Sequence, residues 1–166
     1  MLTKKICMLG AYAVGKTALV QRYVHSIFSD NYFSTVGVKI SKKVVSLEEQ
    51  DLILVLWDLE GKDDYVDVKI NYLRGSMGFF VVADGTRRET LDTALTLRTL
   101  AIDLIGPVPH ALLVNKADLL PSWEIEEPQL LALEGQGVPV LKTSAKLGLT
   151  VDEAFTSLAR AMHGTT

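Results

Sequence analysis

The residues most clearly arranged for chemistry lie near the N-terminus, in the segment Gly10-Ala11-Tyr12-Ala13-Val14-Gly15-Lys16-Thr17. It fits the pattern G-x-x-x-x-G-K-[ST], in which backbone N–H groups surround a phosphate at the start of a helix. Lys16 can reach the outer phosphates of a nucleotide, and the Thr17 hydroxyl can coordinate Mg²⁺. An apolar strand over 6–9 and a helix over 18–24 flank the segment. The alternative is an ordinary strand-to-helix turn with two glycines, and the flanking elements favour a phosphate-binding loop.

A second segment, Asp58-Leu59-Glu60-Gly61, follows the apolar run 52–57. A carboxylate at a strand end near bound phosphates can hold Mg²⁺ through water, so Asp58 is a candidate for a metal site. Gly61 has no side chain, and its backbone N–H can therefore approach a γ-phosphate. The four-residue pattern is common by chance, and its value comes from its place at the end of a strong strand.

The segment Asn115-Lys116-Ala117-Asp118 comes directly after the apolar run 111–114. The Asp118 carboxylate can accept hydrogen bonds from the N1–H and the 2-amino group of guanine. Adenine offers neither donor on that edge, so a buried aspartate left unpaired would reject it. Asn115 and Lys116 would brace neighbouring loops and cover the base. A solvated turn at a strand end is the alternative interpretation.

Three weaker candidates gain meaning only beside these motifs. Thr143-Ser144-Ala145-Lys146 follows the strand-like run 138–141, where it can offer a backbone N–H to the guanine oxygen and help orient Asp118. Thr35 lies in an irregular stretch, from which it could give Mg²⁺ a hydroxyl and a γ-phosphate an amide. Phe28 could pack against a base, and it could equally be a core anchor.

Composition indicates an ordinary globular chain of 166 residues, with 48% hydrophobic and 22% charged residues. The formal net charge of -3 gives no reason to expect nucleic-acid binding. The single cysteine, Cys7, excludes an internal disulfide and favours a reducing, cytoplasmic setting. We expect no membrane span, no signal peptide and no permanent lipid anchor in this chain. The histidines lack partners at metal spacing and are interpreted as structural: His25, His110 and His163.

Strand-like and helix-like segments alternate along the chain. Strands are expected over 6–9, 44–47, 52–57, 79–83, 111–114 and 138–141, and helices over 18–24, 91–104 and 151–162. A shorter helix is expected after Pro128. Thr150, with Glu153 three residues later, predicts a capping box on the last helix. The alternation predicts one α/β domain over 1–166, with a mainly parallel sheet covered on both faces and ligands at the carboxyl ends of its strands.

Taken together and in order, these motifs resemble the Ras superfamily of small GTPases over essentially the whole chain. The similarity leans toward the Rab-like branch through Ser34-Thr35-Val36-Gly37, Trp57-Asp58 and Tyr72-Leu73-Arg74-Gly75. The resemblance implies a P-loop NTPase G domain, a six-stranded mostly parallel sheet with one antiparallel edge strand and five surrounding helices. It also implies a monomeric switch between GDP and GTP, in which the segments around Thr35 and after Asp58 are ordered by the γ-phosphate and Mg²⁺.

By motif match, the resemblance assigns the site residue by residue. The phosphates would be bound by Ala13, Val14, Gly15, Lys16, Thr17 and Ala18, with Tyr32 closing over them. Mg²⁺ would be held by Thr17, Thr35 and Asp58, and the γ-phosphate would be contacted by Thr35 and Gly61. The guanine site would consist of Phe28, Asn115, Lys116, Asp118, Ser144, Ala145 and Lys146. Protein effectors and regulators would contact the switch segments, with apolar candidates Phe33, Val36, Val38, Trp57, Tyr65 and Tyr72.

Two residues depart from the family pattern. The glutamine that usually follows the D-x-x-G glycine, and that orients the attacking water, is Lys62 here. An ammonium has three donors and no acceptor, so Lys62 would be a poor replacement in catalysis. Tyr12 stands where many relatives have a small residue, and its ring would crowd that glutamine position and any arginine supplied by a partner. We therefore expect intact nucleotide binding and slow GTP hydrolysis.

Three functions remain open on sequence alone. The first is a guanine-nucleotide switch with weak GTPase activity, and the second is an adaptor that keeps GTP or GDP permanently. The third, a P-loop ATPase or kinase, requires Asp118 to be incidental and leaves no room for a second substrate domain. An arginine from the chain itself could assist hydrolysis, the candidates being Arg74, Arg87 and Arg88.

Overall fold

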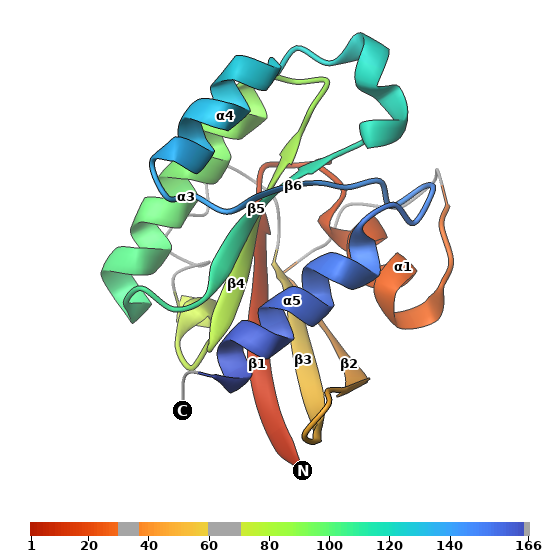
Figure 1. Ribbon diagram of the computed structural model, residues 1–166, viewed down its shortest axis with the longest axis vertical. Coiled ribbons are helices and arrows are strands. Elements are labelled where there is room, and N and C mark those ends of the chain that lie inside the picture. The colour runs from red at the N-terminus through yellow and green to blue at the C-terminus, as the bar shows by residue number, and fades with distance from the viewer. Residues whose placement is uncertain (30–36, 60–70, 165–166) are drawn as a thin grey trace.

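The computed structural model describes residues 1–29, 37–59 and 71–164, and a six-stranded sheet lies at its centre (Figure 1). The strands are β1 (Leu2–Gly10), β2 (Val38–Ser46), β3 (Asp51–Leu59), β4 (Gly78–Asp84), β5 (His110–Asn115) and β6 (Val140–Lys142). Their order across the sheet is β2-β3-β1-β4-β5-β6. The edge pair β2 and β3 is antiparallel, and the other neighbouring pairs are parallel. The predicted mostly parallel sheet is confirmed.

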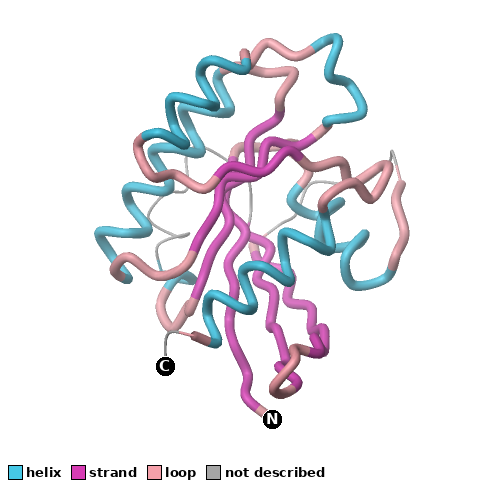
Figure 2. The backbone as a smooth tube through the Cα atoms, in the orientation of Figure 1, coloured by secondary structure: helices cyan, strands magenta, loops and turns pink. Residues whose placement is uncertain are grey.

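Helices cover both faces of the sheet, as predicted (Figure 2). The described α-helices are α1 (Lys16–His25), α3 (Glu89–Ile105), α4 (Glu127–Gly135) and α5 (Val151–His163), and a short 3-10 helix, η2, spans Ala117–Ser122. Buried side chains of α1 and α5 share one core cluster, and those of α3 and α4 share the cluster on the opposite face. Because both faces are covered, every residue of β4 is buried, and the strand is a continuous apolar run up to Asp84.

Several strands begin at other residues than expected. β1 starts at Leu2, four residues before the predicted run 6–9, and β3, β4 and β5 each start one residue early. The run over 44–47 belongs to β2, which starts at Val38 and pairs with β3 along its whole length, from Val38 opposite Leu59 to Ser46 opposite Asp51. Polar residues alternate with apolar ones along this edge strand and hide its first half from a search for apolar runs. β6 starts only at Val140, because Pro139 has no N–H for the ladder and contributes its carbonyl alone, to the Leu112 N–H at 2.8 Å.

The predicted capping box at Thr150 is wrong. Thr150 has φ 64° and makes no side-chain cap hydrogen bond to α5. Ser144 and Leu149 exchange two backbone hydrogen bonds of 3.1 Å just before it, and this tight loop delivers the chain to α5 in a left-handed turn rather than in the extended geometry of an N-cap. A capping box does occur at α4, where the Glu126 N–H donates to Gln129 Oε1 at 2.9 Å.

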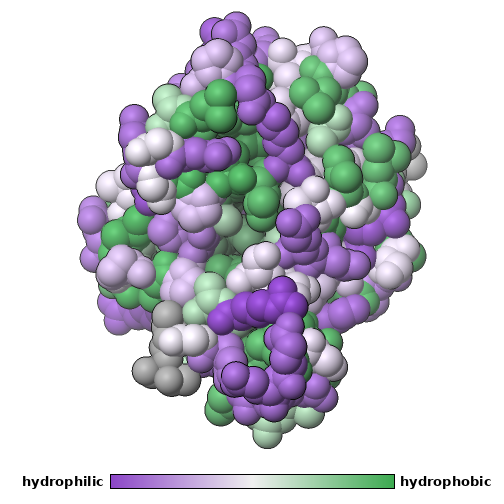
Figure 3. Space-filling model, in the orientation of Figure 1, coloured by the Kyte–Doolittle hydropathy of each residue, from purple (hydrophilic) through white to green (hydrophobic). Residues whose placement is uncertain are grey.

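None of the helices among the described residues is both long and apolar enough to cross a bilayer. Hydrophilic and hydrophobic side chains are interspersed on the face shown in Figure 3. This agrees with the mixed composition of the sequence.

Phe155 is the aromatic centre of the core under α5. It is fully buried, its ring stacks on Tyr23 with centroids 4.1 Å apart, and it meets the edge of Phe80 at 5.0 Å. We expect Phe155→Ala to lower the free energy of unfolding by about 3–5 kcal/mol, because truncation leaves a cavity between α1, α5 and the sheet. Urea denaturation measures this, with Leu131→Ala at a site that is 57% exposed as control. A loss no larger than that of the control would contradict the packing described.

His110 gives stability a pH dependence. Burial lowers its pKa, and nearby Arg98 lowers it further, although the hydrogen bond between Nδ1 and the Val108 carbonyl (2.8 Å) opposes this. The folded pKa therefore lies below the unfolded value of about 6.5, so the unfolded state takes up the proton first. Unfolding free energy should fall as pH drops from about 7 to 5, and His110→Gln should flatten this fall. Equal pH profiles for wild type and His110→Gln would refute the assignment.

Candidate functional site

The candidate site residues that the structure describes gather at the carboxyl ends of the parallel strands. The phosphate-loop segment 10–17 follows β1, Asp58 lies near the end of β3, Asn115 ends β5, and 143–146 follow β6. Because these strands are parallel members of one sheet, their carboxyl ends meet at the same edge. Side chains and backbone from the loops after β1, β5 and β6 are joined there by hydrogen bonds.

The phosphate loop needs a glycine at its end. Gly15 has φ 105° and precedes the first residue of α1, whose Leu19 N–H donates to the Gly15 carbonyl at 2.9 Å. A Cβ at Gly15 would lie 2.1 Å from Asn115 Nδ2, so any other residue would collide with the Asn115 side chain. The N-terminus of α1 thus opens directly onto the loop, with the positive end of the helix facing the site.

Lys16 brings a positive charge under the loop. Only 6% of the residue is exposed, and its ammonium donates to the carbonyls of Gly10 and Ala11, at 3.0 Å each. The side chain therefore curls back along the loop instead of extending into solvent. The ammonium is thus held beside the first two carbonyls of the phosphate-loop segment.

Thr17 and Asp58 form the described part of the predicted metal site. The Thr17 hydroxyl donates to Asp58 Oδ2, and Asp58 is 1% exposed, opposite Met8 in the ladder between β1 and β3. Hydroxyl and carboxylate oxygens are the ligands that Mg²⁺ prefers, so this donor pair fits a magnesium ion. Among the described residues, no group of three or more His, Cys, Asp or Glu side chains is arranged to hold a metal ion.

Asn115 ties three loops together. It is 2% exposed, and its Nδ2 donates to the Val14 carbonyl in the phosphate loop at 3.1 Å. Its Oδ1 accepts from the Thr143 hydroxyl at 3.1 Å and from the Ala145 N–H at 3.3 Å. One buried amide thus links the loops after β1, β5 and β6 through both of its polar ends.

Asp118 and the segment after β6 lie together. The Ser144 hydroxyl donates to Asp118 Oδ1 at 2.7 Å and accepts from the Leu147 N–H at 3.0 Å. Arg22 of α1 holds this segment from the other side, with Nε donating to the Ala145 carbonyl at 2.7 Å and Nη2 to the Lys146 carbonyl. The Asp118 carboxylate is therefore oriented by a hydroxyl that is itself anchored.

Several predicted residues fall outside this picture. Phe28 is partly buried and packs against the core cluster shared by α1 and α5. The predictions for Tyr32, Thr35, Gly61 and Lys62, and the effector candidates Phe33, Val36 and Tyr65, lie outside the described residues. Of the three arginine candidates, Arg87 reaches the phosphate loop, and Nη2 of Arg88 donates to the Glu124 carbonyl instead. The Arg74 carbonyl accepts from Lys5 at 2.8 Å.

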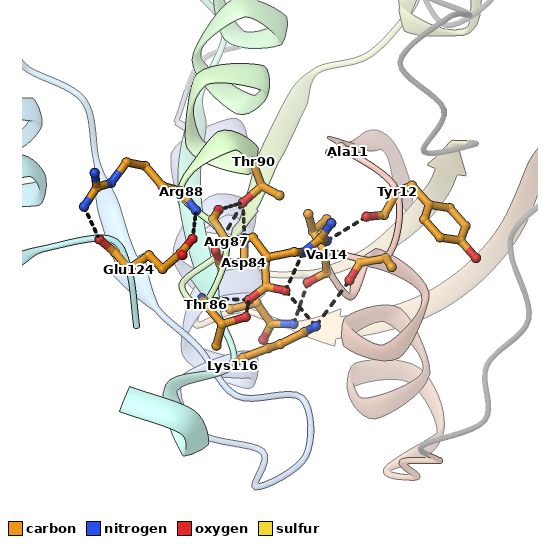
Figure 4. A network of polar contacts seen from close by, with 12 residues as sticks. Ala11, Tyr12, Val14, Asp84, Thr86, Arg87, Arg88, Thr90, Lys116 and Glu124 are labelled. Atoms are coloured by element: carbon orange, nitrogen blue, oxygen red, sulfur yellow. Dashed lines mark hydrogen bonds and ion pairs between the residues drawn. The ribbon is translucent and has the colours of Figure 1, made fainter. Parts of the chain in front are cut away.

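The sequence reasoning missed Asp84, the last residue of β4. Its Oδ2 lies 2.7 Å from Lys116 Nζ and 3.1 Å from Arg87 Nε, and its Oδ1 accepts from Thr86 (Figure 4). Burial would raise its pKa, but the hydrogen bonds from Lys116, Thr86 and Arg87 outweigh it and hold the pKa of this carboxyl below its ordinary value. A signal was present, since Asp84 follows a buried strand just as Asp58 and Asn115 do.

Comparison with known sequences decides the family. The sequence model of the Ras family matches residues 5–164. The chain belongs to the Ras family. Among relatives, Ras-related protein Rab-13 of Canis lupus familiaris is 31% identical over 158 residues, covering 94% of this chain and 78% of the relative.

Other Rab proteins are similar to a comparable extent. Rab-7b of Bos taurus is 33% identical, covering 93% of this chain and 80% of the relative. Rab-8B of Homo sapiens is 30% identical, covering 94% and 76%. This Ras-family chain is thus a Rab-like small GTPase, a GTP-binding switch protein, on the P-loop fold that the sequence predicted.

Asp118→Ala tests the base-recognition geometry. If Asp118 accepts from guanine as the sequence predicts, loss of the carboxylate removes two charge-assisted hydrogen bonds to the base, and we expect GDP affinity to fall at least about 100-fold. Isothermal titration calorimetry on nucleotide-free protein measures this. The matched control is Asp103→Ala, an exposed aspartate at the far end of α3, which should bind as wild type does. Wild-type affinity in Asp118→Ala would contradict the assignment.

Proposed function

We propose that this Ras-family chain is a single G domain that binds GTP and GDP with Mg²⁺ at the carboxyl edge of its sheet, and that it hydrolyses GTP slowly. The observation that carries the binding part is the Asn115 amide, which joins the phosphate loop to the loop of Ser144 and Ala145. A ligand with a guanine at one end and phosphates at the other matches the two loops so joined. ATP would offer the Asp118 carboxylate no donor from its base, so the guanine nucleotide is preferred.

In this proposal, separate groups of residues bind the phosphates, the Mg²⁺ ion and the guanine base. Backbone amides from Ala13 to Ala18 and the Lys16 ammonium bind the phosphates, while Thr17, Asp58 and Thr35 hold Mg²⁺, which neutralises phosphate charge when bound. Asp118, oriented by Ser144, accepts from the guanine edge, and the base is flanked by the groups already assigned to it: Phe28, Asn115, Lys116, Ala145 and Lys146. Tyr32 and Gly61 complete the phosphate end.

Slow hydrolysis is proposed from two residues. Lys62 has no acceptor with which to orient the attacking water, although its charge can stabilise the γ-phosphate. Tyr12 is 53% exposed and lies in the phosphate loop, where its ring would obstruct an arginine offered by a partner. Thr35 and Gly61 would still position the γ-phosphate, so hydrolysis would be slowed rather than abolished.

Lys62 and Tyr12 also favour a second function, that of an adaptor. A chain that holds its nucleotide and turns it over hardly at all would act as an adaptor, a protein-binding module with a fixed conformation. The Thr17–Asp58 pair favours the switch, because a metal site built from these oxygens would sense the nucleotide state. The two functions therefore differ in nucleotide turnover and not in nucleotide binding.

Protein partners would contact the face next to β2 and β3. Trp57 and Tyr72 are half-buried there with ring centroids 5.9 Å apart, and the Lys5 ammonium lies 3.6 Å from the Trp57 centroid. Val38 packs against the same cluster. Half-buried aromatic rings beside the switch segments are suited to an effector surface. We place the protein in the cytoplasm on the grounds of its single cysteine, Cys7, which is buried as a free thiol. That it is a monomer is proposed from the family resemblance alone.

The nucleotide content of the purified protein tests the proposal. We expect GDP or GTP on release by denaturation, and turnover of added GTP that requires Mg²⁺. Adenine nucleotide in the extract would refute the base assignment. Bound GTP that persists for hours in Mg²⁺ would replace the switch with the adaptor.

Lys62→Gln tests the explanation for slow hydrolysis. A glutamine restores an acceptor for the attacking water, and we expect single-turnover GTP hydrolysis to accelerate at least about tenfold. Lys62→Ala is the control, since it removes the charge without supplying an acceptor, and should stay slow. Wild-type protein that already hydrolyses GTP as fast as Lys62→Gln would disprove the explanation.

A further inference from the structure

A cluster of polar residues, Asp84, Thr86, Arg87 and Lys116, contacts the carbonyls of the phosphate loop. The proposed function does not explain this cluster. Asp84 lies at the end of β4, opposite Asn115 in the ladder with β5, and is fully buried. A buried carboxylate is costly unless its charge is paired and its oxygens are hydrogen-bonded. Here Oδ1 accepts from the Thr86 N–H (2.9 Å) and hydroxyl (2.7 Å), and Oδ2 faces the cations of Arg87 and Lys116.

Both cations continue from Asp84 to the phosphate loop. Arg87 Nη2 donates to the Tyr12 carbonyl at 2.7 Å, and Lys116 Nζ donates to the Ala13 carbonyl at 3.4 Å. Asn115 Nδ2 takes the next carbonyl, that of Val14, at 3.1 Å. Three consecutive carbonyls of the loop are thus bound by side chains from the ends of β4 and β5, as Figure 4 shows for Arg87 and Lys116.

Binding those carbonyls orients the opposite side of the same peptides. In a planar trans peptide the C=O and the following N–H point in opposite directions. Carbonyls of Tyr12, Ala13 and Val14 that face the cluster therefore turn the N–H groups of the next residues, Ala13, Val14 and Gly15, away from it. These are amides that the proposed function assigns to the phosphates.

The turn that carries Arg87 is itself rigid. The Asp84 N–H donates to the Thr90 hydroxyl at 2.8 Å, that hydroxyl lies 2.7 Å from the Arg87 carbonyl, and the Arg87 N–H donates to the Asp84 carbonyl at 2.9 Å. Arg88 leaves the same turn in another direction, with its N–H donating to Glu124 Oε1 at 2.9 Å. The two adjacent arginines thus have different partners: Arg87 contacts the phosphate loop, and Arg88 contacts Glu124.

The backbone of Lys116 is fixed by a hydrogen bond from Trp123. Lys116 has φ 73°, and its carbonyl accepts from Trp123 Nε1 at 2.8 Å. The indole packs directly on Gly85, where a Cβ would lie 2.0 Å from ring atom Cε2, so the residue after Asp84 has to be glycine for this packing. The cluster is therefore anchored both in the β4 turn and in the base-recognition loop.

We propose that Asp84 and Arg87 are positioning residues that couple the base-recognition loop to the phosphate loop and thereby set how slowly guanine nucleotide is released. The inference rests on the proposed nucleotide site. Arg87 acts through the Tyr12 peptide, since its Nε is bound to Asp84 and its Nη2 to the Tyr12 carbonyl. Loss of this contact leaves the Tyr12–Ala13 peptide free to rotate, and the amide no longer stays aimed at the phosphates.

Release of radiolabelled GDP into excess unlabelled GDP tests the proposal on the Mg²⁺-loaded protein. Arg87→Ala should release GDP about tenfold faster than wild type, the effect of one charge-assisted hydrogen bond. Arg88→Ala is the matched control and should release GDP at the wild-type rate. Arg87→Lys should be intermediate, because an ammonium can reach one partner but lacks the fork for both.

A second measurement separates positioning from general destabilisation. In ¹⁵N-labelled GDP-bound protein, the amide signals of Ala13 and Val14 should shift in Arg87→Ala and stay in place in Arg88→Ala, while urea midpoints of the two variants remain similar. Asp84→Asn keeps the size of the side chain and should also accelerate release.

The outcomes distinguish the two proposals. Equal GDP release from Arg87→Ala and Arg88→Ala, with wild-type protein holding GDP, would overturn the coupling and leave the proposed function intact. Wild-type protein that holds no guanine nucleotide would overturn both. Faster release in Arg87→Ala without movement of the loop amides would also overturn the positioning role.

Discussion

The site depends on one buried amide. Asn115 has no freedom to turn, because Nδ2 is bound to the Val14 carbonyl while Oδ1 accepts from Thr143 and Ala145. The glycine at position 15 follows from this arrangement, since the amide occupies the space where a Cβ would stand. Loops from three different strand ends are thus fixed relative to one another by a single side chain. These loops do not have to rearrange when a ligand binds across them, and such preorganisation favours tight binding.

The buried charge of Asp84 also fixes the phosphate loop relative to its neighbours. Asp84 is fully buried at the carboxyl end of β4, which lies between β1 and β5 in the sheet. Its negative charge holds Arg87 and Lys116 in place, and these hold loop carbonyls in turn. A phosphate loop has to present its N–H groups to the ligand, so its carbonyls need partners on the opposite side. The cluster supplies them.

The fold was largely predictable because its signals are local and apolar. Buried strands such as β4 are continuous hydrophobic runs, and α5 shows a helical period that its buried residues follow. Predictions were wrong where tertiary contacts outweighed a local pattern. Thr150 matches a capping box in sequence, yet the bridge between Ser144 and Leu149 sets its backbone in a left-handed turn. The first half of β2 pairs with β3 through its backbone and needs no apolar run.

By itself, the sequence determined which chemical groups are present and in what order: a glycine-rich loop with Lys16 and Thr17, the carboxylate Asp58 after an apolar run, Lys62, and the aspartate Asp118 for which we propose a role in guanine recognition. These follow from short motifs, whose residues are neighbours in the chain. The tertiary structure decided which groups touch. The pairing of Asp84 with Lys116, and the choice of Arg87 over Arg88 for the phosphate loop, depend on the order of β1, β4 and β5 and on one turn. Such contacts join residues far apart in the chain, where no spacing rule applies.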